Sequence, residues 1–209
     1  MKKILSLAAL ATFLLGGSAH AATLILDGDF ANANPSFATI FNGSSFGPWN
    51  VTSGSIDLIG GYWQSPTVGG GSVDLDGKSP GSISQVFNAP AGNYMLNFSL
   101  SGNPDGGIGT KFVQVSVGGT TETFSYNVTA ANARPSSMLY APESVAFSTP
   151  GGPIALSFLS LDGAGSFGAV VGGVSVVSSV PLPASLMLFI SGLTGLFFFA
   201  RRRQQNTKI

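Results

Sequence analysis

Tyr94-Met95-Leu96-Asn97-Phe98-Ser99-Leu100 alternates apolar and polar residues with a period of two. In an extended chain the apolar residues share one face, and Asn97 and Ser99 lie on the opposite face. The segment therefore predicts a β-strand that is buried on one side only.

A second pattern follows directly in the chain. Val113, Val115 and Val117 alternate with polar residues, Gly118-Gly119 comes next, and residues 121–128 alternate again. Two alternating segments joined by a Gly-Gly pair predict a β-hairpin. Short segments of the same kind recur between Gly, Pro, Asn and Asp residues, at 49–52, 55–59, 72–75, 82–87, 144–147, 154–161 and 169–177.

No helical period is evident between Phe30 and Val180. Many short strands separated by turn residues predict an all-β fold, a β-sandwich of the jelly-roll type, over residues 22–177. In such a sandwich Trp49 is expected to pack in the core.

The two ends of the chain have a different character. Lys2-Lys3, an apolar stretch and the small-residue site Ala19-His20-Ala21 predict a signal peptide over residues 1–21. Residues 178–183 form a linker with the motif Val180-Pro181-Leu182-Pro183. Residues 184–200 carry no charge, and as a helix they would measure about 26 Å, so they predict a short transmembrane helix.

Arg201, Arg202 and Arg203 open a basic tail, residues 201–209, which the positive-inside rule places in the cytoplasm. The expected precursor is membrane-anchored, with its domain on the periplasmic side. Between Asp27 and Asp162 the chain has all nine acidic residues and three basic ones, a net charge of −6. This charge argues against a nucleic-acid partner.

The chain has no cysteine, and its single histidine, His20, lies in the predicted signal peptide. A mature domain without His or Cys has no Ser-His-Asp triad, no Cys-His pair and no zinc site of the usual ligands. We therefore expect no enzyme and no cofactor. Catalysis by carboxylates alone, as in glycoside hydrolysis, remains an alternative.

The motif Val180-Pro181-Leu182-Pro183, with the uncharged segment and the three arginines, resembles the PEP-CTERM sorting signal of Gram-negative bacteria. Leu182 stands where that family more often has glutamate. The resemblance implies an exosortase-type membrane protease as partner, removal of the tail, and delivery to the cell surface or extracellular matrix. Tails of this kind also carry an ice-binding-protein label, although the chain has no regular Thr-X-Thr ladder.

The body of the chain resembles bacterial choice-of-anchor C domains and related plant cell-wall proteins, which share a galactose-binding-like jelly roll. The similarity is carried by four segments, residues 26–30, 49–57, 81–85 and 101–107. Such folds often hold calcium between an Asn-Gly-Asp-Phe-Glu segment and a late Asp. Asp27 and Asp29 remain here as a remnant, but Ala31 replaces the Glu and Gly172-Gly173 replaces Asp-Asn, so no metal is expected.

Two groups of residues are candidates for ligand binding. Tyr62 and Trp63, in a Gly-rich loop, suit either sugar stacking or core packing. Asn103 and Asp105 lie in a loop that has the look of a functional loop, but the residue preferences of turns also explain its sequence. Asp74 and Asp76 share a strand face and could act together as ligands or as an acid and a base. A face exposed to solvent is the preferred interpretation.

Three hypotheses about function follow. The first is an exported surface or matrix protein whose jelly roll binds polysaccharide weakly, with exopolysaccharide as the expected partner. The second is a carboxylate-dependent glycan-cleaving enzyme. The third is a membrane-tethered structural protein that is never cleaved.

Overall fold

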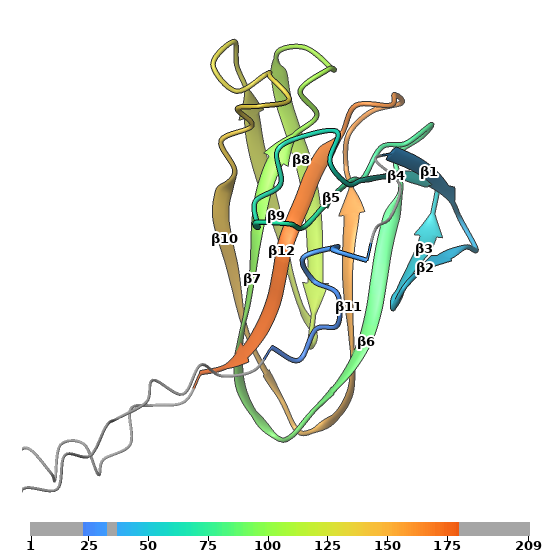
Figure 1. Ribbon diagram of the computed structural model, residues 1–209. Helices are drawn as coiled ribbons and strands as arrows, with labels where there is room; N and C mark the ends of the chain where they lie inside the picture. The colour runs from blue at the N-terminus through green and yellow to red at the C-terminus, as the bar shows by residue number, and fades with distance from the viewer. Residues whose placement is uncertain (1–22, 33–36, 180–209) are drawn as a thin grey trace, which may run out of the picture.

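The computed structural model describes residues 23–32 and 37–179. The predicted signal peptide, sorting motif, transmembrane helix and basic tail lie outside these residues. Within them no helix is long and apolar enough to cross a membrane. The described chain forms two antiparallel sheets packed face to face (Figure 1), which confirms the prediction of an all-β sandwich.

The strands have the following bounds: β1 (Phe37–Phe41), β2 (Ser45–Phe46), β3 (Trp49–Ser53), β4 (Ser55–Ile59), β5 (Ser72–Asp74), β6 (Ser82–Ala89), β7 (Gly92–Gly102), β8 (Gly109–Val117), β9 (Thr120–Val128), β10 (Ala141–Thr149), β11 (Gly152–Ser160) and β12 (Ala169–Ser178).

The strand order identifies the topology. One sheet has the order β1-β4-β5-β12-β7-β10 and the other β2-β3-β6-β11-β8-β9. If β5 to β12 are renumbered 1 to 8, these strands have the order 1-8-3-6 in the first sheet and 2-7-4-5 in the second. Two such four-stranded sheets make a jelly roll, and β1 to β4 extend both sheets at one edge.

The predicted hairpin is present between β8 and β9. Val117 pairs with Thr120, which leaves Gly118 and Gly119 as a two-residue turn. Both glycines have positive φ, 56° and 83°. A type I′ turn requires this backbone conformation, which residues with a Cβ rarely adopt.

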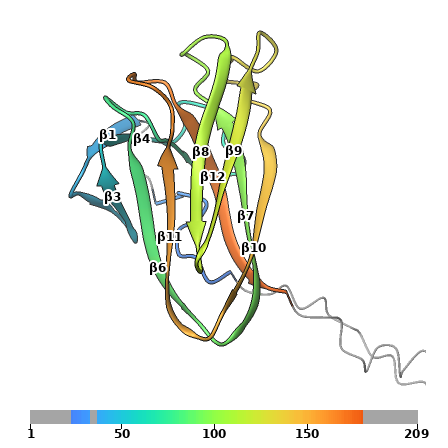
Figure 2. The same ribbon diagram turned by 180° about the vertical axis from the view of Figure 1, so that it is seen from behind.

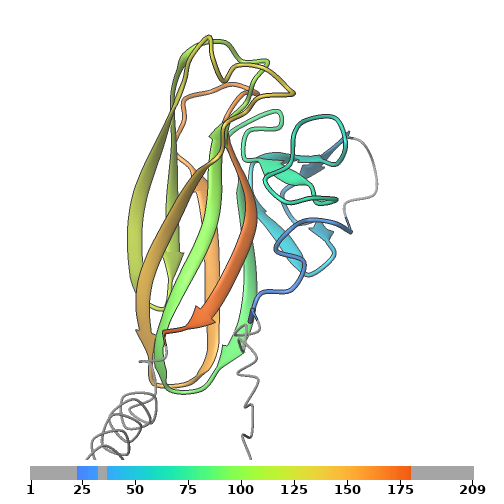
Figure 3. The ribbon, with the colours of Figure 1, turned by 60° about the vertical axis from the view of Figure 1, so that its left-hand side comes forward.

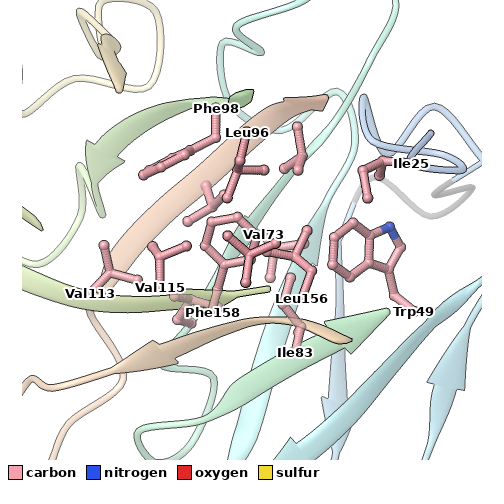
Figure 4. Packing of buried hydrophobic residues seen from close by; sticks show 14 of the residues in the cluster. Ile25, Trp49, Val73, Ile83, Leu96, Phe98, Val113, Val115, Leu156 and Phe158 are labelled. Carbon is pink, nitrogen blue, oxygen red and sulfur yellow. The ribbon is translucent and has the colours of Figure 1, made fainter. Parts of the chain in front are cut away.

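The core lies between the sheets, as Figure 4 shows. Tyr94, Leu96, Phe98 and Leu100 of β7 are buried on one face, as the alternation predicts. Phe98 meets Phe158 of β11 edge to face at 5.3 Å. Trp49 is fully buried between Phe30 and Phe158, which confirms its core position.

The N-terminal segment, residues 23–32, packs beside the last strand. Leu24 N donates to Val176 O, and Val174 N donates to Gly28 O at 2.7 Å. A Cβ on Gly28 would lie 1.9 Å from Val174 O, so only glycine allows this close approach.

Turns and loops gather at opposite ends of the sandwich. The short β6–β7, β8–β9 and β10–β11 turns lie at one end, and β12 runs toward that end (Figures 1 and 2). The longer loops, residues 103–108, 129–140 and 161–168, lie together at the other end, which we call the loop end. Figure 3 shows the β4–β5 loop beside them.

Candidate functional site

Tyr62 and Trp63 lie in the β4–β5 loop, and the structure gives them opposite environments. Trp63 is 6% exposed and belongs to a small apolar cluster with Ile59, Met138 and Val170. Tyr62 is 55% exposed. Its ring centroid lies 5.9 Å from that of Trp63 and 6.2 Å from that of Phe37 of β1, so two aromatic neighbours hold the exposed ring.

Hydrogen bonds connect the β4–β5 loop, which carries this pair, to the β9–β10 loop. Gln64 N donates to Pro135 O at 2.7 Å, and the Gln64 side-chain oxygen accepts from Met138 N. The hydroxyl of Tyr140 donates to Gln64 O at 3.1 Å. These hydrogen bonds hold the backbone of the loop that carries Tyr62.

Asp105 joins the same group from the β7–β8 loop. Trp63 Nε1 donates to Asp105 Oδ2 at 3.3 Å, while Asp105 itself is exposed. The Asn103 side-chain oxygen accepts from Asp105 N at 2.8 Å, an Asx turn. The carboxylate is therefore held beside the aromatic pair and still faces solvent.

Asn103 is buried and has a second bond that ties the loop to the sheet. Its Nδ2 donates to Asp74 Oδ2 at 2.6 Å. Asp74 Oδ1 also accepts from Asp76 N and Gly168 N, each at 3.0 Å. Burial raises the pKa of Asp74 well above its ordinary range, and these bonds oppose the shift.

The structure thus brings together all four residues predicted as possible ligand-binding groups. Tyr62 and Asp105 can meet a ligand directly, while Trp63 and Asn103 hold them in place. Sequence reasoning missed Phe37, which the fold places against Tyr62 from a strand that the alternation did not predict. Phe37 is 46% exposed, so the patch of Phe37, Tyr62 and Asp105, here called the aromatic patch, faces solvent.

The preferred interpretation of Asp74 and Asp76 as a solvated face was wrong. Both carboxylates are buried, because segments distant in sequence cover this part of the strand. Gly168 lies against Asp76 so closely that a Cβ there would be 2.5 Å from Asp76 Cγ. Neither carboxylate oxygen of Asp76 has a hydrogen-bond partner.

A second group of charged residues lies at the loop end. A pocket of about 250 Å³ is lined by Lys111 and Asp162 with residues of the β7–β8 and β11–β12 loops. Asp162 Oδ1 accepts from Phe112 N at 2.8 Å, but its Oδ2 is buried without a partner. The Lys111 ammonium donates to Phe167 O. Sequence reasoning gave no signal that joins Asp162 to Asp76.

Asp27 and Asp29, the remnant of a calcium segment, have structural partners. Asp27 Oδ1 accepts from Asn32 N and Nδ2, and Asp29 Oδ1 accepts from Ala31 N. Trp49 Nε1 donates to Asp27 O at 3.1 Å. Across residues 23–32 and 37–179, no three His, Cys, Asp or Glu side chains form a group that could hold a metal.

No family model matches the chain. It is 34% identical over 100 residues to halomucin of Haloquadratum walsbyi, a match that covers 44% of this chain and 1% of halomucin. The chain therefore spans about one hundredth of the length of that relative.

Solved structures with a similar fold include three carbohydrate-binding modules. A family 61 module in complex with β-1,4-galactotriose is 15% identical, with 76% of this chain and 100% of that chain covered and a TM-score of 0.48. A family 35 module from Paenibacillus barcinonensis is 16% identical, with 68% and 99% covered and a TM-score of 0.40.

The third is a family 36 module of a xylanase from the hindgut metagenome of Trinervitermes trinervoides. It is 14% identical, with 70% of this chain and 99% of that chain covered and a TM-score of 0.40. TM-scores below 0.5 at these identities assign neither a family nor a ligand to the chain.

Proposed function

We propose that this protein is an exported surface or matrix protein whose jelly roll binds a neutral polysaccharide at the aromatic patch. The observation that carries the proposal is the exposed ring of Tyr62, held by Phe37 and Trp63 beside the fixed carboxylate of Asp105. An aromatic ring offers its face to the apolar face of a sugar, and a carboxylate accepts hydrogen bonds from its hydroxyl groups.

The charge of the domain narrows the ligand class. The region from Asp27 to Asp162 has a net charge of −6, and the patch itself contributes Asp105. A polyanionic chain would meet repulsion both at long range and at the patch. Neutral hexose or pentose polymers are therefore the expected ligands, bound weakly because the rings of Phe37 and Tyr62 and one carboxylate make few contacts.

Affinity electrophoresis in gels that contain neutral polysaccharides tests the binding. The wild-type protein should be retarded, and Tyr62→Ala should lose most of the retardation while Tyr62→Phe keeps it. Phe112→Ala is the matched control, because Phe112 is an aromatic residue 41% exposed on the other sheet. Absence of retardation on every glycan would exclude the binding function, and full retardation of Tyr62→Ala would exclude the site.

Export and sorting rest on the two ends of the sequence. The signal peptide at residues 1–21 and the PEP-CTERM-like tail support secretion followed by cleavage near Pro181-Leu182-Pro183 by an exosortase-type protease. Mass spectrometry of the mature C-terminus, in cells with and without that protease, tests the proposal. A C-terminus that still includes residues 184–209 in both strains would favour the uncleaved tether instead.

The geometry gives little support to the alternative of a glycan-cleaving enzyme. Glycoside hydrolysis needs two carboxyl groups on either side of the scissile bond. Asp74 and Asp76 are shielded from solvent, and three structural hydrogen bonds occupy Asp74. Neither can reach a polymer without displacing the loops that cover it.

A further inference from the structure

Asp76 has an unusual environment for a carboxylate. The residue is 1% exposed, and both of its side-chain oxygens are buried without a hydrogen-bond partner. Burying an ionised carboxylate without compensation is costly, so buried carboxylates are normally paired, hydrogen-bonded, protonated or bound to a cation. Burial raises the pKa of Asp76 to about 6, and the nearby Ser160 hydroxyl only partly opposes the shift.

A second carboxylate lies close to the first. Asp162 N donates to Ser160 Oγ at 3.2 Å, which places the start of the β11–β12 loop beside the same hydroxyl. Asp162 Oδ2 is likewise buried and unpartnered. The negative charge of Asp162 adds to the effect of burial and raises the pKa of Asp76, because like charges repel. Three orphaned carboxylate oxygens therefore come from two residues that are far apart in sequence.

A pocket lies on the Asp162 side of this pair of carboxylates. Asp162 lines the pocket of about 250 Å³ whose other walls include Gly106, Lys111 and Phe167. Asp76 lies beneath Gly168, the residue that follows Phe167. The Lys111 charge lowers the pKa of both carboxyl groups, yet its ammonium donates to the Phe167 carbonyl. One lysine balances only one of the two negative charges.

We propose that Asp76 and Asp162, with the Ser160 hydroxyl, bind a hard divalent cation, calcium, beneath this pocket. Calcium takes six to eight oxygen ligands in flexible geometry, which suits two carboxylates, a hydroxyl and pocket waters. Magnesium demands nearly ideal octahedral geometry and fits such a set less well. Two carboxylates beside a lysine give a weak site, of about millimolar affinity, as in extracellular modules.

This site differs from the other candidates in the molecule. It shares no residue with the Asp27 and Asp29 segment, whose Oδ1 atoms accept bonds within the segment. It is also separate from Tyr62 and Phe37 of the aromatic patch. The β7–β8 loop links the two regions, because Asp105 bonds to Trp63 and Gly106 lines the pocket.

Calcium binding to the full chain in detergent, freed of metal with EDTA, tests the proposal by isothermal titration and thermal unfolding. A millimolar site should raise the Tm by about 3–6 °C at 10 mM CaCl₂. Asp76→Asn and Asp162→Asn should each weaken binding by at least about tenfold. Lys111→Met should strengthen it several-fold, because the variant removes a like charge near the cation.

Asp76→Asn has a second signature that separates a lost ligand from a misfolded chain. Without calcium it should be at least as stable as the wild type, because it removes a buried unpaired charge. Asp29→Asn is the matched control and should keep the calcium response. No calcium binding at 10 mM, an equal response to MgCl₂, or a response that survives both Asp→Asn changes would overturn the proposal.

Discussion

The indole Nε1 of Trp63 donates to Asp105 Oδ2 at 3.3 Å, across a separation of 42 residues in sequence. The bond joins the β4–β5 loop to the β7–β8 loop. It gives the buried ring of Trp63 a polar partner and holds the Asp105 carboxylate next to the indole, whose other neighbour is Tyr62. The geometry of the aromatic patch thus depends on a residue that is itself hidden from the ligand.

Trp63→Phe should weaken polysaccharide binding although Trp63 is buried. The change frees Asp105 to rotate, and re-ordering one side chain on binding costs about 0.5–1.5 kcal/mol, or roughly 2- to 10-fold in Kd. Affinity electrophoresis gives the change in Kd. Asp105→Asn, which keeps an acceptor oxygen for the indole, should retain more stability than Trp63→Phe. Unchanged affinity in Trp63→Phe would show that the indole bond does not orient the carboxylate.

Asn103→Ala should destabilise the domain strongly. Asp74 Oδ2 would lose its donor at 2.6 Å in a fully buried position, at a cost of about 3 kcal/mol. Urea denaturation measures the loss. Asn127→Ala, at an exposed position of β9, should change the unfolding free energy by less than about 0.5 kcal/mol. A loss for Asn103→Ala as small as that of the control would contradict this account.

Asp57 should make the protein less stable as the pH rises. Burial raises its pKa, and the bond from Thr39 Oγ1 at 2.6 Å only partly opposes the shift. A carboxyl whose pKa is higher in the folded state binds its proton more tightly there. Its contribution is therefore complete below the unfolded value of about 3.9 and is lost as the pH rises through the folded value.

The urea midpoint, measured in EDTA from pH 4 to 7, should fall less steeply in Asp57→Asn than in the wild type. Glu122→Gln, on an exposed position of β9, provides the control and should follow the wild-type curve. If Asp57→Asn also follows that curve, burial of Asp57 contributes nothing to the pH dependence.

Gly28→Ala should loosen the N-terminal segment. The new Cβ would meet Val174 O at 1.9 Å, so the backbone bond from Val174 N to Gly28 O must break or shift. The expected loss is about 2 kcal/mol or more. Amide hydrogen exchange at Val174 should increase as well. Gly61→Ala, where a Cβ would meet nothing within 4 Å, should be close to neutral, and equal losses in the two variants would refute the steric argument.

The strands were predictable because one face of each sheet packs on a core. β4, at Ser55–Ile59, has the predicted bounds, and β7 contains the alternating segment in full. β1 was missed, since all its side chains are exposed or half-buried and no apolar face stands out. β2 has only two residues, too few for a period.

The candidate site was predictable in part. The residue types of Tyr62 and Asp105 suggested binding, but no local pattern distinguishes exposed Tyr62 from buried Trp63 next to it. Asp74 and Asp76 follow the alternation of a solvated face, and only the loops that cover them make that inference fail. Burial by segments nearly a hundred residues away, such as Gly168 against Asp74, leaves no mark on the local sequence.

The direction of β12 determines how the molecule would be presented if it is attached through its C-terminus. This strand has ten residues, or about 33 Å of extended chain, and it begins beside Gly102 at the loop end. It finishes beside Tyr94 at the end of the short turns (Figure 1). Any surface joined beyond Ser178 would therefore lie at the end of the sandwich that carries the short turns. The loop end, with Asp105 of the aromatic patch, would stand roughly a strand length above that surface and would face polymers that approach from outside.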